Sequence, residues 1–254
     1  MKKNLYYRTV FKRSNAFKEG VLAFFLAFCS WPRLLLEVFI RKNFGERYFS
    51  FASAMTVSGI LALLPLIYLE TMSRIFRNSE GMTFISHFAT WYVYLAGFLY
   101  MCLQRNEEIK HLPSVFDFGR FSLSTGEIHP RFREVTFNGI PADIRTIEIW
   151  LEPLPFALGG FVLWVFGQPI GFIIFLSSIF YSLSYAGAYH QGDHFIMDKI
   201  DEMICNEEMV NAFVEGRDPS ETRGVNFYGR RPADPDVRRR LVDGFIDDDT
   251  VEAL

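Results

Sequence analysis

The sequence predicts an all-α polytopic membrane protein, because three long stretches of the chain carry no Asp, Glu, Lys or Arg. These stretches are residues 48–69, 81–104 and 154–189. A helix rises about 1.5 Å per residue, so about 20 apolar residues cross a hydrocarbon layer of about 30 Å. Half of the residues are hydrophobic and 17% are aromatic, which agrees with a chain that is largely embedded in lipid.

The basic N-terminal segment, residues 1–47, is expected to lie on the membrane surface. Its apolar side chains recur at helical spacing and form one stripe: Trp31, Leu34, Leu35, Val38 and Phe39. Arg33, Glu37 and Arg41 lie off this stripe. Such a pattern is typical of a helix in the membrane interface, so we predict an interfacial amphipathic helix at 17–42.

Two other interpretations of this segment have less support. The apolar part, 21–31, has eleven residues, which is too few for a crossing. A cleaved signal peptide needs a small residue before the cut, and the residue in front of Cys29 is Phe28. We therefore expect the helix to remain in the chain and to bend where Pro32 removes a backbone donor.

The next part, residues 48–104, is expected to hold the first two transmembrane helices, at 48–69 and 81–104. Small residues recur in the first of them at the spacing that lets helix backbones approach closely: Ala54, Ser58 and Ala62. This packing suits contacts within one chain as well as contacts between protomers, so a homo-oligomer stays open.

The middle loop, residues 105–152, is expected to be a small folded element. Asn138-Gly139 between two apolar runs resembles the turn of a β-hairpin, since both residues tolerate positive φ. Alternating Ile147, Ile149 and Leu151 extend this pattern as a strand. Alternatively, Pro141-Ala142-Asp143 opens a helix at this place. We favour the β-hairpin.

Residues 153–189 are expected to form a tight transmembrane hairpin, so that the chain has about four transmembrane helices. Gly167-Gln168-Pro169 interrupts the uncharged stretch near its middle and supplies the turn. The first arm, 155–166, has only a dozen residues, or about 18 Å of helix. Either this arm is re-entrant and protected by protein, or the bilayer thins around it.

Charge counting predicts on which side the loops lie. With a hairpin at 153–189, the N-terminus, the middle loop and the tail share one side. Ten Lys/Arg up to Arg47 and six in the middle loop lie there, against Arg74 and Arg77 on the other side. The positive-inside rule then makes both termini cytoplasmic. We expect an integral protein of a bacterial inner membrane.

The tail, residues 190–254, is acidic, with 8 Lys/Arg against 16 Asp/Glu. This charge is repelled by phosphates, so we expect no nucleic-acid partner. An amphipathic helix at 193–215 and later apolar residues are expected to bind other protein subunits. The candidate partner-binding residues are Ile196, Ile200, Met203, Phe227, Tyr228 and Phe245.

One group of residues has the chemistry of metal ligands. His190, His194, Asp198 and Glu202 recur every four residues and would share one helical face. The more common explanation is a polar helix that leaves the membrane, because no H-E-x-x-H pattern is present and Gly192 weakens a continuous helix. We therefore expect no metal, no cofactor and no catalytic residue.

Three classes of function remain, and the first is favoured. A non-enzymatic scaffold or assembly subunit of a multi-protein complex would dock partners through its loop and tail, as in an envelope secretion or conjugation apparatus or a membrane-acting defence system. An oligomeric pore is the first alternative, although the three uncharged stretches hold no ionisable residue except His87. A metal-dependent membrane enzyme that uses His190, His194 and Asp198 is the second.

Overall fold

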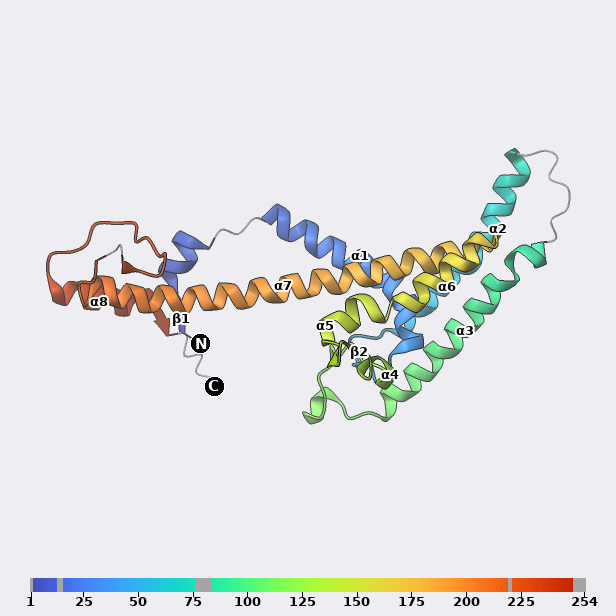
Figure 1. Ribbon diagram of the computed structural model, residues 1–254, viewed down its shortest axis with the longest axis horizontal. Helices are drawn as coiled ribbons and strands as arrows, with labels where there is room; N and C mark the ends of the chain where they lie inside the picture. Colours follow the sequence, from blue (N-terminus) through green and yellow to red (C-terminus); the bar gives the residue numbers. More distant parts are fainter. Residues whose placement is uncertain (1, 13–15, 76–83, 219–220, 249–254) are drawn as a thin grey trace. The chain divides into compact units, whose positions relative to one another are not determined.

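The computed structural model describes residues 2–12, 16–75, 84–218 and 221–248 and is mostly helical (Figure 1). It divides into two compact units, residues 22–188 and residues 1–21 with 189–254, and we describe each by itself. Four helices are long and apolar enough to cross a membrane: Phe17–Ile40, Phe51–Tyr68, Ile144–Val165 and Pro169–Phe213. The expectation of a helical, multi-pass membrane protein is therefore confirmed.

In the larger unit, α2 (Phe51–Ile75) packs against α3 (Phe84–His111). The indole of Trp91 on α3 donates to the carbonyl oxygen of Leu61 on α2, at 2.9 Å. Ala54 and Ser58 on α2 are buried, so packing inside the chain already uses two of the small residues. α3 matches the second expected span in position, but it is not among the four most apolar helices, because Thr, Trp and Tyr interrupt its apolar sequence.

The middle loop holds both structures that its sequence allowed. After η2 (Val115–Asp117) and α4 (Pro130–Arg133), strands β2 (Thr136–Phe137) and β3 (Ile140–Pro141) form the expected hairpin. Asn138 and Gly139 have φ values of 52° and 81°, as a tight two-residue turn requires. The strand expected at 147–151 is wrong, because the chain is helical there: α5 (Ile144–Thr146) leads into the π-helical η3 (Ile147–Leu151).

This helical stretch corrects the length of the first hairpin arm. α6 (Leu154–Val165) has only 12 residues, but η3 and α5 precede it, and the apolar segment Ile144–Val165 has 22. At about 1.5 Å per residue this segment is about 33 Å long, enough for a crossing. The arm is thus longer than the dozen residues expected, although its first part carries Arg145, Glu148 and Glu152.

The hairpin turn itself is a helix C-cap with glycine. Gly167 has a φ of 75°, and its N–H donates to the carbonyl of Trp164 while that of Gln168 donates to Leu163. These two bonds form a Schellman motif, which ends α6 before α7 (Pro169–Phe213) begins. The arms approach closely: a Cβ placed on Gly171 would lie 2.6 Å from the carbonyl oxygen of Gly160. Thr90 on α3 also donates to the Gln168 side chain, at 2.6 Å.

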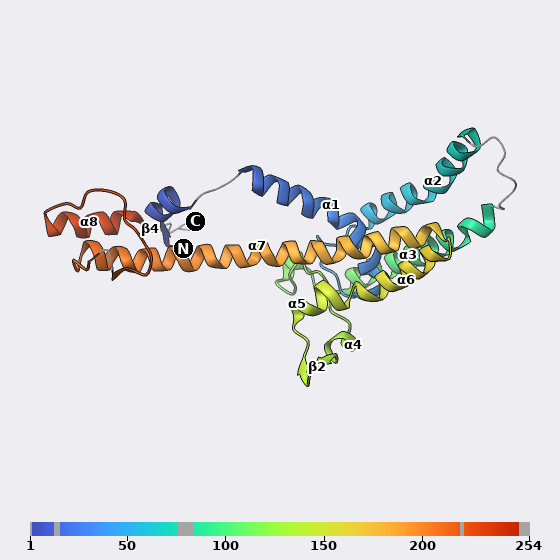
Figure 2. The same ribbon diagram turned by 45° about the horizontal axis from the view of Figure 1, so that its top comes forward.

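α1 (Ala16–Ile40) is a single helix through Pro32. Its second half contacts α7 at Phe180, Ser184 and Gly187 (Figures 1 and 2). It also contacts α3, since Tyr94 and Arg105 donate to carbonyl oxygens of α1. The polar side of its second half is buried, although we expected it to face water. Glu37 and Arg41 are 1% and 0% exposed, as deeply buried as the stripe residues Leu35 and Val38. The partners described below explain this burial.

The smaller unit is built from both ends of the chain. β1 (Lys2–Asn4) pairs antiparallel with β4 (Ile246–Asp248), and η1 (Tyr7–Phe11) follows β1. α8 (Pro235–Phe245) begins as expected, since Asp234 accepts from the N–H of Asp236. We expected a separate tail helix at 193–215, and this prediction is wrong about where the helix begins. The tail helix is the second part of α7, which continues through Gly192 without a break. The buried core of this unit consists of Tyr7, Cys205, Met209 and Val242.

Candidate functional site

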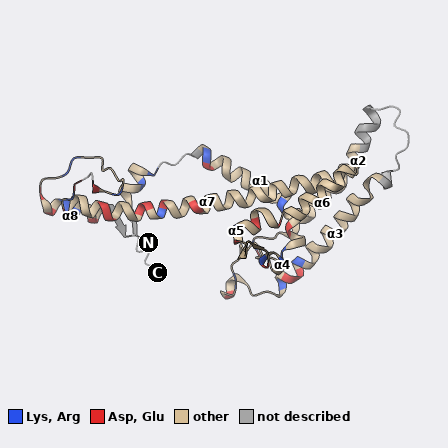
Figure 3. Ribbon diagram, in the orientation of Figure 1, with Lys and Arg blue, Asp and Glu red and all other residues tan. Residues whose placement is uncertain are grey.

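Five charged side chains of the larger unit lie inside the protein and contact one another. We call them the charge network: Arg33, Glu37, Arg41, Glu148 and Glu152. Their side chains are between 0% and 14% exposed. Figure 3 shows how few other charged residues lie on α2, α6 and the upper part of α3, in contrast to the second half of α7. Buried charges of this kind are rare unless they are paired.

Arg41 is the centre of the network. Its Nε donates to both oxygens of Glu152, at 3.1 and 3.2 Å, and its Nη2 donates to Glu152 and, at 3.0 Å, to Glu148. Nη1 donates to the hydroxyl of Thr125 at 3.1 Å. Tyr181 on α7 donates to Glu152 at 2.6 Å. All three guanidinium nitrogens of Arg41 donate hydrogen bonds, and both oxygens of Glu152 accept them. Bidentate pairs of this kind are the strong charge-assisted hydrogen bonds of proteins.

Arg33 and Glu37 make the second half of the network. Arg33 donates to the hydroxyl of Ser184 at 2.8 Å, and its Nε lies 3.3 Å from Glu37. Glu37 accepts from the hydroxyls of Tyr48 and Tyr185, each at 2.7 Å. The ring of Tyr185 lies between the two guanidinium groups, 5.0 Å from Arg33 and 4.8 Å from Arg41. These two cation–π contacts join the halves of the network.

This arrangement is suited to holding helices together. It links α1 to η3 and to α7, three elements that are far apart in the sequence, and each carboxylate is held by hydroxyl or guanidinium donors. A cavity of about 110 Å³ lies beside it, lined partly by Ser30, Ser50 and Ser53. It is polar and large enough for a few water molecules. The network is therefore a polar clamp with access to water.

The sequence analysis did not predict the clamp because its charged residues lie outside the three uncharged stretches and were expected to face water. A signal was present, however. Arg33, Glu37 and Arg41 are spaced four residues apart, as are Glu148 and Glu152. The first set places two cations and one anion on one helix face, and the second places two anions on one face, so Arg33 and Arg41 offer partners for the two glutamates. What the sequence lacks is the information that these faces meet.

The predicted partner-binding residues fall into two groups. Ile196, Ile200 and Met203 are 58%, 50% and 64% exposed and lie along one face of α7, which we call the α7 stripe. By contrast, Phe227 packs against the core of its own unit. Tyr228 is exposed, with its backbone bonded to the hydroxyl of Tyr6. The side chain of Phe245, at the end of α8, lies outside the described part of the structure.

The face of α7 opposite the stripe is covered by the N-terminal segment. Asn4 is fully buried: its N–H donates to Glu202 at 2.8 Å, and its side chain bonds Asn206 and the N–H of Tyr7. Burial, together with the charges of Asp198, Asp201 and Glu202, raises the pKa of Tyr7 to about 12, so this phenol stays neutral. The two faces of this part of α7 therefore differ in burial: one is covered by the N-terminal segment and the other carries the exposed stripe.

Replacing Asn4 with alanine is expected to loosen this cover. The change removes the hydrogen bonds of the Asn4 side chain to Cys205, Asn206 and the N–H of Tyr7, which costs about 1–3 kcal/mol. Limited proteolysis of the detergent-solubilised protein should then cut the N-terminal segment faster than in the unchanged chain. Leu5→Ala is the matched control, because Leu5 is 50% exposed. Equal cutting of both variants would contradict a role for Asn4 as the anchor.

The four candidate metal ligands do not gather into a site. The rings of His190 and His194 lie against each other, 4.2 Å between centroids. Asp198 pairs with Lys12 at 3.1 Å, and Glu202 pairs with Lys199 at 2.7 Å. Among the described residues, no three His, Cys, Asp or Glu side chains are placed to hold a metal ion. The spacing therefore reflects a polar helix face that is used for ion pairs.

A scan against protein-family models and searches of curated proteins and of solved structures returned no match for this chain.

Proposed function

We propose that the chain is a non-enzymatic assembly subunit of a multi-protein membrane complex and that the α7 stripe docks a partner protein. The observation that carries this proposal is the exposure of Ile196, Ile200 and Met203 on a helix whose opposite face is already covered by the chain itself. Exposed apolar side chains in a row on a polar helix mark protein contact sites. Three residues are too few to form a whole protein interface, but they are enough to form its central apolar part.

The pairing of β1 with β4 supports a topology in which both termini lie on one side of the bilayer. Two strands of one sheet cannot be separated by hydrocarbon, so the number of crossings between them is even. We count α2, Ile144–Val165 and the first half of α7 as crossings, since they are apolar enough to span. We count α3 as the fourth because it lies at the uncharged stretch 81–104. A fifth crossing by α1 would separate the termini, which favours an interfacial α1.

The side that carries the termini is proposed to be the cytoplasm of a bacterium, with the chain in the inner membrane. The support is the excess of Lys/Arg before Arg47 and in the middle loop over the pair Arg74 and Arg77. On this topology the α7 stripe faces cytoplasmic partners. A secretion or conjugation apparatus and a membrane-acting defence system are assemblies of this kind.

The test is site-specific photo-crosslinking in native membranes. A photo-crosslinking amino acid in place of Ile200 is expected to trap one protein partner, identified by mass spectrometry. The double variant Ile200→Asp, Met203→Asp is expected to weaken the purified complex by about a hundredfold, since each buried apolar contact contributes about 1.4 kcal/mol or more. The variant should still fold, because both side chains are exposed.

The matched control is Asp201, which is exposed on α7 but lies off the stripe. A crosslinker there should trap little, and Asp201→Ala should leave the complex intact. Recovery of a lone monomer from mild detergent, with no crosslink from position 200, would contradict the assembly proposal.

An oligomeric channel is the second candidate, favoured by the polar cavity beside the charge network. If the purified chain conducts ions in planar bilayers, a channel explains the structure better than an assembly subunit does.

A further inference from the structure

Three phenylalanines of the middle loop extend into solvent from one short turn. Phe116, Phe118 and Phe121 are 91%, 101% and 70% exposed. We call residues 114–121, which carry them, the aromatic turn. Large aromatic side chains are normally buried, and three fully exposed ones within six residues form an apolar patch that needs a partner.

The aromatic turn has a defined conformation. Ser114 caps η2 by accepting from the N–H of Phe116 at 3.3 Å, and its carbonyl accepts from the N–H of Gly119 at 3.2 Å. Phe118 has a φ of 54°, in the left-handed region that a phenylalanine rarely adopts. Gly119 lies so close to Pro113 that a Cβ would be 2.4 Å from the proline side chain. The backbone is thus held in a strained shape that directs Phe118 outward.

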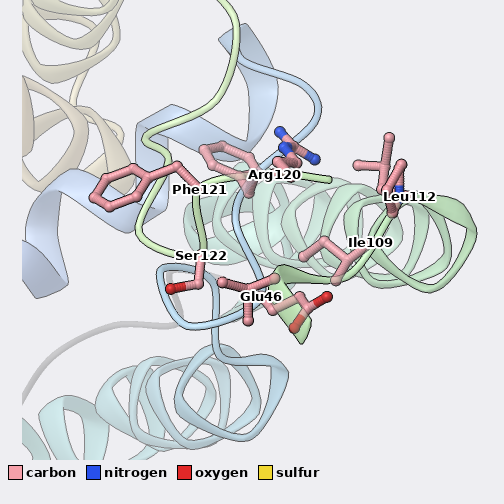
Figure 4. A pocket seen from close by; sticks show the side chains of 9 residues that line it. Glu46, Ile109, Leu112, Arg120, Phe121 and Ser122 are labelled. Atoms are coloured by element: carbon pink, nitrogen blue, oxygen red, sulfur yellow. The ribbon is translucent and has the colours of Figure 1, made fainter. Parts of the chain in front are cut away.

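The base of the turn is fixed to the end of α3. Figure 4 shows the small hollow between Ile109 and Leu112 on α3 and the returning segment with Arg120 and Phe121. This hollow has no room for a water-sized ligand. Its function is therefore packing, and it makes the turn a rigid continuation of α3.

That continuation places the turn at the membrane surface. The uncharged part of α3 ends at Gln104, and seven further residues lead to His111, a rise of about 10 Å. The headgroup layer on each side of the hydrocarbon is about 5–8 Å thick, so the end of α3 lies just outside it and the phenylalanines of the turn must extend back toward the bilayer to enter it. α3 packs along α2, which is one of the four apolar helices, so its end lies beside the same bilayer surface. Arg120 lies within the turn and suits a lipid phosphate, whereas Lys110 near its start is paired with Glu107 at 2.7 Å.

We propose that the aromatic turn inserts Phe116 and Phe118 into the interfacial layer of the bilayer and thereby anchors the middle loop to lipid. The occupant of the patch is lipid because the patch continues directly from α3. The open hollow along the end of α3, lined by Tyr100, Leu103 and His111 among others, includes none of the three phenylalanines. The inference is independent of the partner-docking function and of which side of the membrane the loop occupies, since each leaflet offers the same interface.

Spin-label depth measurements on the full chain in phosphatidylcholine vesicles test this directly. Phe118→Cys carries the label, and Glu134→Cys, an exposed position in the same loop, is the control. The three native cysteines are buried, so the unsubstituted chain gives the labelling background. The ratio of collisions with oxygen to collisions with a water-soluble nickel chelate should be at least about threefold higher at position 118 than at 134, because oxygen concentrates in the apolar layer.

The result that overturns the proposal is equal access of the nickel chelate to positions 118 and 134. Protection of position 118 that appears in native membranes but not in vesicles would also overturn it, because a protein would then cover the patch. Phe116→Cys repeats the measurement at a second site, in case the label disturbs the strained backbone at 118. Both substitutions are at exposed positions, so melting temperatures in detergent should match that of the unchanged protein.

Discussion

Replacing Arg41 with leucine is expected to destabilise the larger unit more than any other single substitution in the charge network. The change leaves the fully buried carboxylate of Glu152 without its guanidinium partner. Breaking a buried ion pair in this way costs about 3–5 kcal/mol. For a chain of this size that cost lowers the melting temperature by roughly 10 °C. The measurement is thermal unfolding of the protein in mild detergent, followed by light scattering or intrinsic fluorescence.

Three further variants separate the charge effect from a general loss of packing. Lys42→Ala changes the neighbouring exposed side chain and should leave the melting temperature unaltered. Arg41→Lys keeps the charge but loses the forked geometry, so an intermediate loss is expected. Adding Glu148→Gln and Glu152→Gln to Arg41→Leu removes the orphaned charges and should recover part of the stability. A melting temperature for Arg41→Leu equal to that of Lys42→Ala would contradict the clamp.

Replacing Gly171 with alanine is the second change with a large expected effect. The new Cβ would lie 2.3 Å from the backbone nitrogen of Trp164 and 2.6 Å from the carbonyl oxygen of Gly160. Both atoms belong to the backbone of α6, so a rotamer change cannot relieve the overlap, and the two arms must separate. Overpacking of this kind costs about 1–3 kcal/mol or more, and thermal unfolding in detergent should report a clear loss.

Gly159→Ala is a matched control with the opposite expected sign. Position 159 lies on the same helix as Gly160, but a Cβ there meets no atom within 4 Å. Alanine is favoured over glycine in a helix by about 0.5–1 kcal/mol, so this variant should be slightly more stable. The same chemical change is thus expected to stabilise at one glycine and destabilise at the other. If both variants melted alike, the close approach of the hairpin arms would not be a feature of the folded protein.

The α7 stripe and the charge network differ in how far the sequence could predict them. Ile196, Ile200 and Met203 share a helix face because of their spacing alone, and the structure leaves them exposed. The network depends on the meeting of residues more than 100 positions apart, such as Arg41 and Glu152. Periodicity describes one helix at a time and carries no information about which helix faces another.

Phe227 illustrates the same limit in the tail. As an aromatic residue in an acidic segment it resembled a docking residue, but it packs against the core that Tyr7 and Met209 form. The sequence could not indicate that the N-terminal segment returns to this place and supplies the covering strand. This finding also makes point substitutions more informative than a deletion of residues 216–254, which would expose the core.

The sequence by itself determined the membrane class, the helical content and the hairpin turn at Gly167-Gln168-Pro169, because hydrocarbon thickness and backbone chemistry act on local stretches of chain. Only the tertiary structure decided that Glu37 and Arg41 face inward and that the first hairpin arm begins at Ile144. The physical reason is the same in both cases. From sequence alone, a charged residue beside an apolar stretch is expected to face water, because burying it without a partner is costly. Only the fold shows which residue is its partner.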